Sequence, residues 1–307
     1  LPGGWAVGSR PVGFRLAGLG TMGAPVEIGP GYIKAAARRL RGSRIYFDIP
    51  SVTGTENLMM AAVLAEGTTV LENAAKEPEI SDLAAFLVKR GARIVGAGTD
   101  MITVEGVTEL HGADHEVIPD RIEAGTYLVA GAITGGDIVV DRCRPEHMEP
   151  LLMKLRESGA ELIEEKDRVR LKVTGRLKGT NVRTSPHPGF PTDMQAQFVA
   201  LMAVAEGTSV VTETIFESRF MHVEELRRMG ADIRVEGNRV VITGKERLTG
   251  APVMASDLRA SAGLIVAGLA AEGTTEVSRV YHLDRGYERL EEKFRALGAS
   301  IERRKGK

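Results

Sequence analysis

The sequence predicts a mixed α/β (α+β) fold of two domains, built from repeated β-α-β-α-β-β units. A first phrase, AEGTTV or a variant of it, starts at Ala65, Thr134, Ala205 and Ala271. A Gly-Ala pair recurs out of phase with it, at intervals of 68, 68, 71 and 68 residues, with its glycine at positions 23, 91, 159, 230 and 298. The 36 glycines indicate many tight turns. Fixed spacing of this kind is the signature of duplicated structural units.

The best-defined unit can be assigned element by element. Residues 56–67 (ENLMMAAVLAEG) are apolar and end on glycine, which indicates a helix. Residues 68–75 (TTVLENAA) contain β-branched residues and predict a strand. Residues 79–92 (EISDLAAFLVKRGA) place apolar side chains on one helical face and predict an amphipathic helix. Residues 93–106 (RIVGAGTDMITVEG) alternate on both sides of Gly-Thr-Asp and predict a hairpin.

The number of copies is uneven along the chain. Residues 1–42 contain only the end of a unit, residues 43–111 form a full one, and about three more follow. We therefore expect the chain to be an N-terminally incomplete copy of a longer protein.

The composition argues against several classes of protein. The net charge of −1 argues against a general nucleic-acid binder. No apolar run reaches the length of about 18 residues that a membrane helix needs. Cys143 is the only cysteine, which excludes a disulfide framework and fits a reducing cytoplasm. The six histidines show no metal-ligand spacing. We therefore expect a cytoplasmic protein with no metal and with no nucleic-acid or membrane partner.

Each predicted unit has a polar residue where its first helix should start. These residues follow a proline or a small residue, and they are Ser51, Asp120, Asp193 and Asp257. One interpretation is simple N-capping, since such residues accept hydrogen bonds from the first turn of a helix. The other is that the helix N-termini gather on one side and form a positive rim for an anion.

Four arginines lie beside predicted helix starts or the opening loop. They are Arg10, Arg219, Arg259 and Arg285. A single arginine of this kind is usually a solvated surface charge. Four at matching places in the repeats favour a phosphate or carboxylate site, because guanidinium groups bind such anions in a bidentate way.

Several longer motifs carry a resemblance to a known family. They include LPGGWAVGSRPV, ENAAKEPEI, PDRIEAGT, PHPGFPTDMQAQF, TETIFESRFMHVEELRRMGA and YHLDRGYERLEEKFRALGA, and together they span the chain. The chain resembles the UDP-N-acetylglucosamine 1-carboxyvinyltransferases, a family of enolpyruvyl transferases. The resemblance implies the two-domain inside-out α/β barrel of EPSP synthase, with helices inside and a truncated first domain. Residues 1–118 would be the remainder of that domain and residues 119–307 the second.

The resemblance also implies a reaction. The family adds the 3′-hydroxyl of UDP-N-acetylglucosamine to C2 of phosphoenolpyruvate and then eliminates phosphate, without a metal or organic cofactor. Asp193 matches the base that takes the hydroxyl proton, and Asp257 matches the acidic residue near the reacting C3. The groups expected to hold phosphate and carboxylate are Arg10, Arg219, Arg259 and Arg285. The residues expected to bind substrate are Arg10, Pro11, Val12, Gly13, Phe14, Ser51, Val52, Thr53, Glu77, Asp120, Asp193 and Ile215.

The opening loop departs from the family pattern. Trp5 stands where the family carries a cysteine, or an aspartate in some members, which donates a proton or aids product release and is the target of fosfomycin. An indole has no acidic proton in the useful range. The family's catalytic lysine and asparagine would lie before Leu1. Two interpretations stay open: an enolpyruvyl transferase represented by an incomplete or altered chain, or a non-catalytic nucleotide-sugar-binding or structural remnant of the family.

Overall fold

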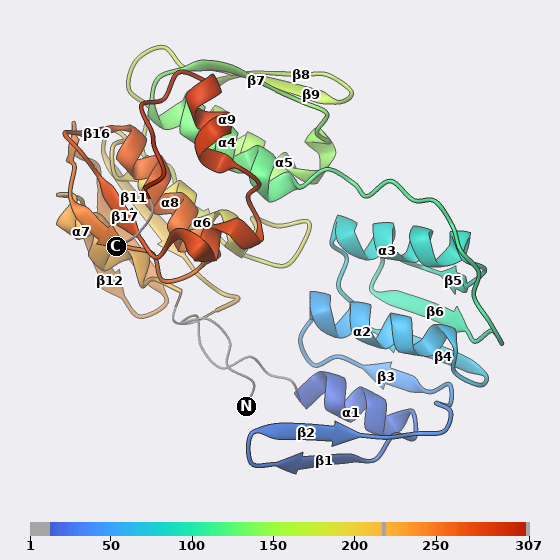
Figure 1. The fold of residues 1–307 in the computed structure, drawn as a ribbon. Coiled ribbons are helices and arrows are strands. Elements are labelled where there is room, and N and C mark those ends of the chain that lie inside the picture. Colours follow the sequence, from blue (N-terminus) through green and yellow to red (C-terminus); the bar gives the residue numbers. More distant parts are fainter. Residues whose placement is uncertain (1–12, 217–218, 305–307) are drawn as a thin grey trace. The chain divides into compact units, whose positions relative to one another are not determined.

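A computed structural model describes residues 13–216 and 219–304 of the chain (Figure 1). The described residues separate into two compact units. Unit 1 comprises residues 13–118 and 186–188, and unit 2 comprises residues 119–185 and 189–304. Each unit has its own hydrophobic core.

Unit 1 contains one complete copy of the repeat. Its elements are α1 (Gly13–Thr21), β1 (Val26–Gly29), β2 (Tyr32–Ala35), and then the copy itself, β3 (Arg44–Tyr46), α2 (Val52–Val63), β4 (Thr68–Glu72), α3 (Pro78–Lys89), β5 (Arg93–Val95) and β6 (Met101–Glu105). The sheet order is β3-β4-β6-β5, with β3 parallel to β4 and the other pairs antiparallel. The predicted order of elements over residues 56–106 is therefore confirmed.

The start of the first predicted helix at Ser51 is confirmed, whereas its predicted end is wrong. The helix α2 starts at Val52, because the Ser51 side chain accepts a hydrogen bond from the backbone N–H of Gly54. It ends at Val63, so Gly67 belongs to the following turn, where it has a φ of +89°. The next helix, α3, ends as predicted, since Gly91 directly follows its C-cap with a φ of +99°.

Unit 2 contains three further copies of the repeat. The first consists of α4 (Arg121–Ile133), β7 (Asp137–Asp141), η1 (Pro145–His147), α5 (Glu149–Glu157), β8 (Glu161–Glu164) and β9 (Arg168–Lys172). The second consists of β10 (Val182–Arg183), η2 (Thr192–Met194), α6 (Gln195–Met202), β11 (Thr208–Thr212), α7 (His222–Arg228), β12 (Asp232–Glu236) and β13 (Arg239–Thr243). The third consists of β14 (Leu248–Thr249), β15 (Pro252–Met254), α8 (Leu258–Leu269), β16 (Ala271–Glu272), β17 (Glu276–Ser278), η3 (Val280–Arg285) and α9 (Leu290–Ala296).

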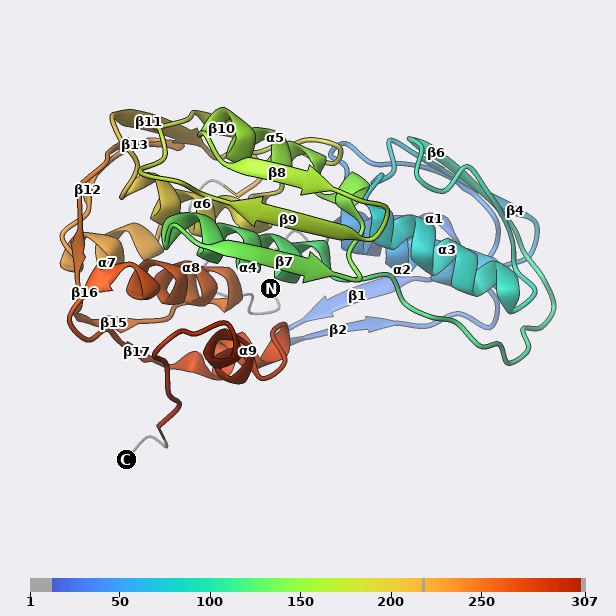
Figure 2. The same ribbon diagram turned by 90° about the horizontal axis from the view of Figure 1, so that it is seen from above.

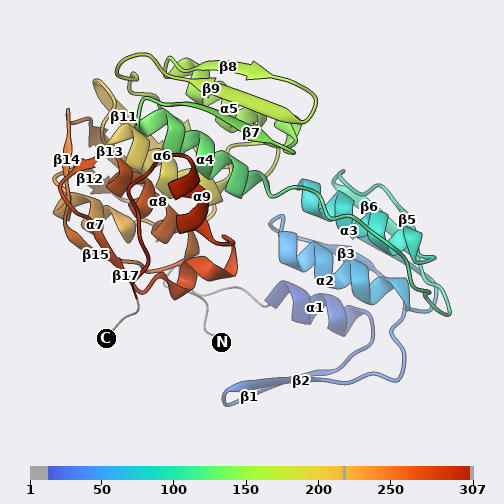
Figure 3. The ribbon, with the colours of Figure 1, turned by 45° about the horizontal axis from the view of Figure 1, so that its top comes forward.

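The sheets of unit 2 show the same duplication. The order β10-β11-β13-β12 repeats the order β3-β4-β6-β5 of unit 1, again with the first pair parallel. The sheet β7-β9-β8 has three strands, and the last copy has the parallel pairs β14-β16 and β15-β17. Two views of the ribbon show α4, α6 and α8 in the interior of unit 2, with the strands outside them (Figures 2 and 3).

The interior helices are mostly apolar around their whole circumference, as expected of helices surrounded by other elements. Every residue of α6 is buried, and α4 is buried from Ala124 to Ile133. The helices α6 and α8 approach very closely, because a Cβ atom added at Gly263 would lie 2.9 Å from the backbone carbonyl atoms of Ala196. This contact fixes the spacing between α8 and the first turn of α6.

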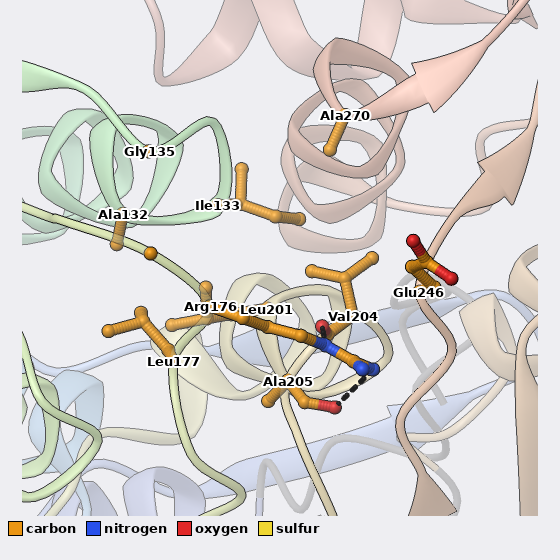
Figure 4. Close-up of a pocket in the computed structure, with 11 residues that line it drawn as sticks. Ala132, Ile133, Gly135, Arg176, Leu177, Leu201, Val204, Ala205, Glu246 and Ala270 are labelled. Carbon is orange, nitrogen blue, oxygen red and sulfur yellow. Dashed lines mark hydrogen bonds between the residues drawn. The ribbon is translucent and has the colours of Figure 1, made fainter.

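The C-terminal ends of the three helices converge on a cavity of about 140 Å³ (Figure 4). Its lining includes Ile133 at the end of α4, Val204 after α6 and Ala270 after α8. Arg176 reaches into this end, where its Nε donates to the carbonyl of Val204 (2.8 Å) and its Nη2 donates to the carbonyl of Ala205 (2.9 Å). A cation here complements the negative ends of the helices. The three N-terminal ends accordingly lie together at the opposite end of unit 2.

We predict that Gly263→Ala lowers the free energy of unfolding by about 1–3 kcal/mol, because the added methyl group meets backbone that cannot move independently. The matched control is Gly20→Ala in α1, where nothing lies within 4 Å of the added atom. There the same change should stabilise by up to about 1 kcal/mol. Urea unfolding measures both. Equal effects of the two substitutions would show that the approach of α6 and α8 is not tight.

Candidate active site

The centre of the candidate site in unit 2 is the carboxylate of Asp193. Its Oδ1 accepts a hydrogen bond from Arg219 Nη1 (2.8 Å), and its Oδ2 accepts one from Arg259 Nε (3.0 Å). The three residues come from η2, from the segment before α7 and from the first turn of α8. Both arginine side chains are only 12% exposed, whereas the carboxylate is 36% exposed. The fold therefore brings together three residues that the sequence singled out separately.

The polar residues at the helix starts have two different roles. Ser51, Asp120 and Asp257 are N-caps whose side chains accept hydrogen bonds from backbone N–H groups of the first turn. Asp193 is not an N-cap, because it lies inside the short helix η2 and directs its carboxylate at the two arginines. The structure thus shows N-capping at Ser51, Asp120 and Asp257, and a different set of contacts at Asp193.

The charges around Asp193 control its protonation. Burial by itself would raise the pKa of the carboxyl, but Arg219 and Arg259 outweigh this effect and lower the pKa to about 2. The group is therefore ionised throughout the neutral range. In this state it balances part of the positive charge of the two arginines.

The Arg259 guanidinium group packs against the ring of Tyr287, a buried aromatic residue. The guanidinium carbon lies 5.6 Å from the ring centroid of Tyr287, a cation–π arrangement. The Tyr287 hydroxyl lies 2.9 Å from Thr126 Oγ1, which itself donates to the carbonyl of Ile122 (2.8 Å) and accepts from Gln197 Nε2 (3.1 Å). Since the threonine proton is already used, Tyr287 is the donor to Thr126. Burial raises the pKa of the Tyr287 phenol, so the hydroxyl keeps its proton.

One group of the cluster has no partner within the described part of the chain. Arg259 Nη1 is buried and makes no hydrogen bond to any residue in the described ranges 13–216 and 219–304. A buried, unpaired guanidinium N–H is costly, and an anionic ligand would satisfy it.

Asp257 and His222 border the same cluster. Asp257 caps α8 by accepting from the backbone N–H groups of Arg259 (2.9 Å) and Ala260 (3.0 Å), and it also accepts from Ser256 Oγ (3.2 Å). His222 is buried next to it. Burial, aided by the charge of Arg219, lowers the pKa of the His222 ring to about 4, although Asp257 partly opposes this shift. The ring is therefore neutral at physiological pH.

The other expected residues of unit 2 lie at its helix starts and turns. Asp120 is the exposed N-cap of α4, Arg285 is the exposed last residue of η3, and Ile215 is half-buried in the turn after β11. Arg285 precedes Tyr287 by two residues, so along the chain it lies close to the aromatic residue that packs against Arg259.

The expected residues of unit 1 lie at the starts of its helices. Gly13 begins α1, Val52 begins α2, and Glu77 is the N-cap residue of α3. Thr53 accepts a hydrogen bond from Arg15 Nη2 (2.9 Å). Phe14 belongs to α1. The expected residues Trp5, Arg10, Pro11 and Val12 lie outside the described residues.

Metal chemistry has no visible ligand set here. The described part of the chain holds no group of three or more histidine, cysteine, aspartate or glutamate residues that could bind a metal ion. Within the same residues, no helix has both the length and the apolar character needed to cross a membrane.

The sequence matches the EPSP synthase (3-phosphoshikimate 1-carboxyvinyltransferase) family over residues 1–294. The chain belongs to this family. Among its enolpyruvyl transferases, the chain is 58% identical over 303 residues to the UDP-N-acetylglucosamine 1-carboxyvinyltransferase of Geotalea uraniireducens, and 58% identical over 305 residues to that of Myxococcus xanthus. In both alignments the match covers 99% of this chain and 73% of the relative.

Solved structures of EPSP synthase family members share the fold. The enolpyruvyl transferase NikO from Streptomyces tendae superposes with a TM-score of 0.86 at 26% identity, over 95% of this chain and 72% of that one. An EPSP synthase from Acinetobacter baumannii superposes with a TM-score of 0.73 at 22% identity over the same share of each chain, which bears on the fold alone. The predicted fold class is therefore confirmed.

Sequence reasoning missed the residues that hold the charged groups in place. These are Thr126, Thr192, Gln197, Glu213, His222 and Tyr287. All but Thr192 are at most 9% exposed, and most of them make hydrogen bonds to one another or to the cluster. The available signal was the two glutamines, Gln195 and Gln197, in an otherwise apolar helix, since a polar residue on a buried helix needs a partner.

Tyr287 should support Arg259 mainly through its ring. We predict that Tyr287→Phe lowers the free energy of unfolding by about 1 kcal/mol, because the hydrogen bond of the hydroxyl to Thr126 (2.9 Å) and the longer one from Gln197 (3.4 Å) are lost. Tyr287→Leu should lower it by about 3 kcal/mol, because the ring packing and the cation–π contact are lost as well. Urea denaturation separates the two cases. If the phenylalanine variant were as unstable as the leucine variant, the hydroxyl network would be the main support.

The neutral ring of His222 should make stability depend on pH. Below pH 6.5 the unfolded chain protonates this ring, whereas the folded protein does not until about pH 4, so stability should fall in this window. We predict that His222→Gln removes about 1–2 kcal/mol of the loss between pH 7.5 and pH 4.5. Asp193 contributes little there, because its lowered pKa matters only below about pH 4. Urea unfolding at the two pH values tests this, and equal losses in both proteins would contradict it.

Proposed function

We propose that the protein transfers the enolpyruvyl group of phosphoenolpyruvate to the 3′-hydroxyl of UDP-N-acetylglucosamine and releases phosphate. The observation that carries this proposal is the Asp193 carboxylate between the buried guanidinium groups of Arg219 and Arg259. The names of relatives that are 57–58% identical over 99% of the chain support it. The protein would act in the cytoplasm, at the first committed step of peptidoglycan synthesis.

The two parts of the chain would be enolpyruvyl transferase domains. Residues 1–118 would be the remainder of the first domain and residues 119–307 the second. Of the residues expected to bind substrate, Asp120, Asp193 and Ile215 belong to unit 2, which also holds the charged cluster, and the other described ones belong to unit 1. Phosphoenolpyruvate carries a carboxylate and a phosphate, and the arginines of unit 2, including Arg285, suit both.

The resting charges suggest how the base would be activated. A carboxyl with a pKa of about 2 is a poor proton acceptor near neutral pH. When the anionic groups of phosphoenolpyruvate bind Arg219 and Arg259, they neutralise the charges that hold this pKa down. The pKa of Asp193 would then rise, and the carboxylate could take the proton of the sugar hydroxyl. Binding of one substrate would thus prepare the base for the other.

The addition also needs a proton at C3. Asp257 would lie near this carbon. Trp5 occupies the position of the family's usual proton donor, and its indole cannot replace a thiol in that role. This substitution favours the alternative that the chain binds the nucleotide sugar without turnover, so binding and turnover must be measured separately.

We predict that Asp193→Asn lowers turnover by about 10²–10⁴-fold, the usual cost of losing a general base. Affinity for UDP-N-acetylglucosamine should stay within about tenfold of the unaltered protein, because the change removes a proton acceptor and leaves the binding surface. Phosphate release measures turnover, and titration calorimetry measures binding.

The outcomes separate the two functions. Unchanged turnover in the variant would assign the base to another residue, with Asp120 the next candidate. Nucleotide-sugar binding with no turnover in the unaltered chain would support the non-catalytic alternative. No binding at millimolar sugar by folded protein would contradict both.

A further inference from the structure

Glu213 is a buried carboxylate that no expected role explains. It follows β11 and is 1% exposed. Its Oε1 accepts hydrogen bonds from Thr184 Oγ1 (2.7 Å) and from the backbone N–H groups of Ile215 (2.7 Å) and Phe216 (3.2 Å). Its Oε2 accepts one from Thr192 Oγ1 (2.8 Å). No lysine, arginine or histidine of residues 13–216 and 219–304 forms an ion pair with it, and its four hydrogen-bond donors are all neutral groups.

One of these hydrogen bonds leads to the charged cluster. Thr192 Oγ1 also lies 2.9 Å from Arg219 Nη1. A guanidinium group can only donate, so Thr192 must accept from Arg219. The hydroxyl has a single proton, and the Glu213 carboxylate can only accept. The donor and acceptor roles in this series of hydrogen bonds are therefore fixed: Arg219 donates to Thr192, and Thr192 donates to Glu213.

This series of hydrogen bonds determines the orientation of the Arg219 guanidinium group. Nη1 carries two protons, and they are directed to Thr192 and to Asp193. With both protons committed, the plane of the guanidinium group is set, and no residue of the ranges 13–216 and 219–304 accepts a hydrogen bond from Nε or Nη2. The Phe216 ring, 5.3 Å from the guanidinium carbon, packs on the same group, and the Glu213 carboxylate holds the backbone of Phe216. Glu213 thus acts on Arg219 by two routes.

We infer that Glu213 is a positioning residue that orients Arg219 through Thr192 for an oxyanion ligand, a phosphate or carboxylate group. The identity of the ligand rests on the proposed function. The hydrogen-bond relay itself does not depend on that function, because it consists entirely of contacts within the chain.

The test compares two threonines that both donate to Glu213. Thr192→Val removes the donor that leads to Arg219, and Thr184→Val removes the donor on the other side. Inorganic phosphate serves as the probe of the arginine site, and calorimetry measures its affinity. Thr192→Val should weaken phosphate binding about tenfold, the worth of one hydrogen bond to a charged group. Thr184→Val should leave the phosphate affinity within about twofold. It should nevertheless lower the free energy of unfolding more than Thr192→Val does, because Thr184 also accepts a hydrogen bond from the backbone of Thr214 (2.9 Å).

Two further variants sharpen the result. Thr192→Ser keeps the hydroxyl and should restore phosphate affinity to within about twofold of the unaltered protein. Glu213→Gln should weaken binding as Thr192→Val does, because the amide offers Thr192 a donor instead of an acceptor. The comparison of threonine variants stands even if the Glu213 variant does not fold.

A second measurement does not require phosphate binding. In a double-mutant cycle of urea unfolding, Thr192→Val and Arg219→Met should be non-additive by at least about threefold in the folding equilibrium constant, since each removes the same interaction. Thr184→Val and Arg219→Met should be additive.

The outcomes distinguish failure of the relay from failure of the proposed function. Additive effects of Thr192→Val and Arg219→Met, or equal weakening of phosphate binding by the two valine variants, would overturn the positioning role. If the unaltered protein bound no phosphate while the cycle stayed non-additive, the relay would stand and the proposed ligand would be wrong.

Discussion

The parallel packing of α4, α6 and α8 is the constraint on which unit 2 depends. These helices are apolar on almost every side, so they must lie inside, and the sheets must lie outside them. Parallel packing gathers the partial positive charges of three N-termini at one end and the partial negative charges of three C-termini at the other. Arg176 donates hydrogen bonds to backbone carbonyl groups at the negative end, and the carboxylates of Asp120 and Asp257 cap α4 and α8 at the positive end. The close contact at Gly263 then sets the distance across which Arg259 reaches Asp193.

The sequence predicted the repeat, the order of elements and the charged residues because these leave local signals. Glycine spacing marks the turns, apolar periodicity marks the helices, and an aspartate after Pro-Thr marks a helix start. It did not predict the difference between Asp193 and its counterparts Asp120 and Asp257, because N-capping and ion pairing begin with the same residue at the same place. Only the positions of two arginines from distant segments separate the two roles.

The supports of the site were beyond the sequence for a different reason. Glu213 and Tyr287 lie 74 residues apart (287 − 213). Glu213 is linked to the cluster through Thr192, and Tyr287 contacts it through the face of its ring. The order of residues along the sequence cannot show such contacts, because they depend on which donors and acceptors the fold brings together. What the sequence does contain is a buried charge in a β-branched stretch, TSVVTET, and a buried charge always requires an account of its partners.

The charges of the cluster explain why both carboxylates are needed. Two buried guanidinium groups without counter-charges would be strongly destabilising, so Asp193 neutralises part of their charge in the resting protein. In the proposed reaction, however, Asp193 takes up a proton, and it then ceases to balance them. Glu213 differs in this respect, because its four hydrogen bonds come from neutral donors and its charge is not part of any proton transfer to substrate. The hydrogen bonds from Arg219 to Thr192 and from Thr192 to Glu213 do not involve Asp193, so they orient the arginine in every protonation state of Asp193. An arginine that stays in place while its neighbouring carboxylate changes charge is what binding of an anion next to a working base requires.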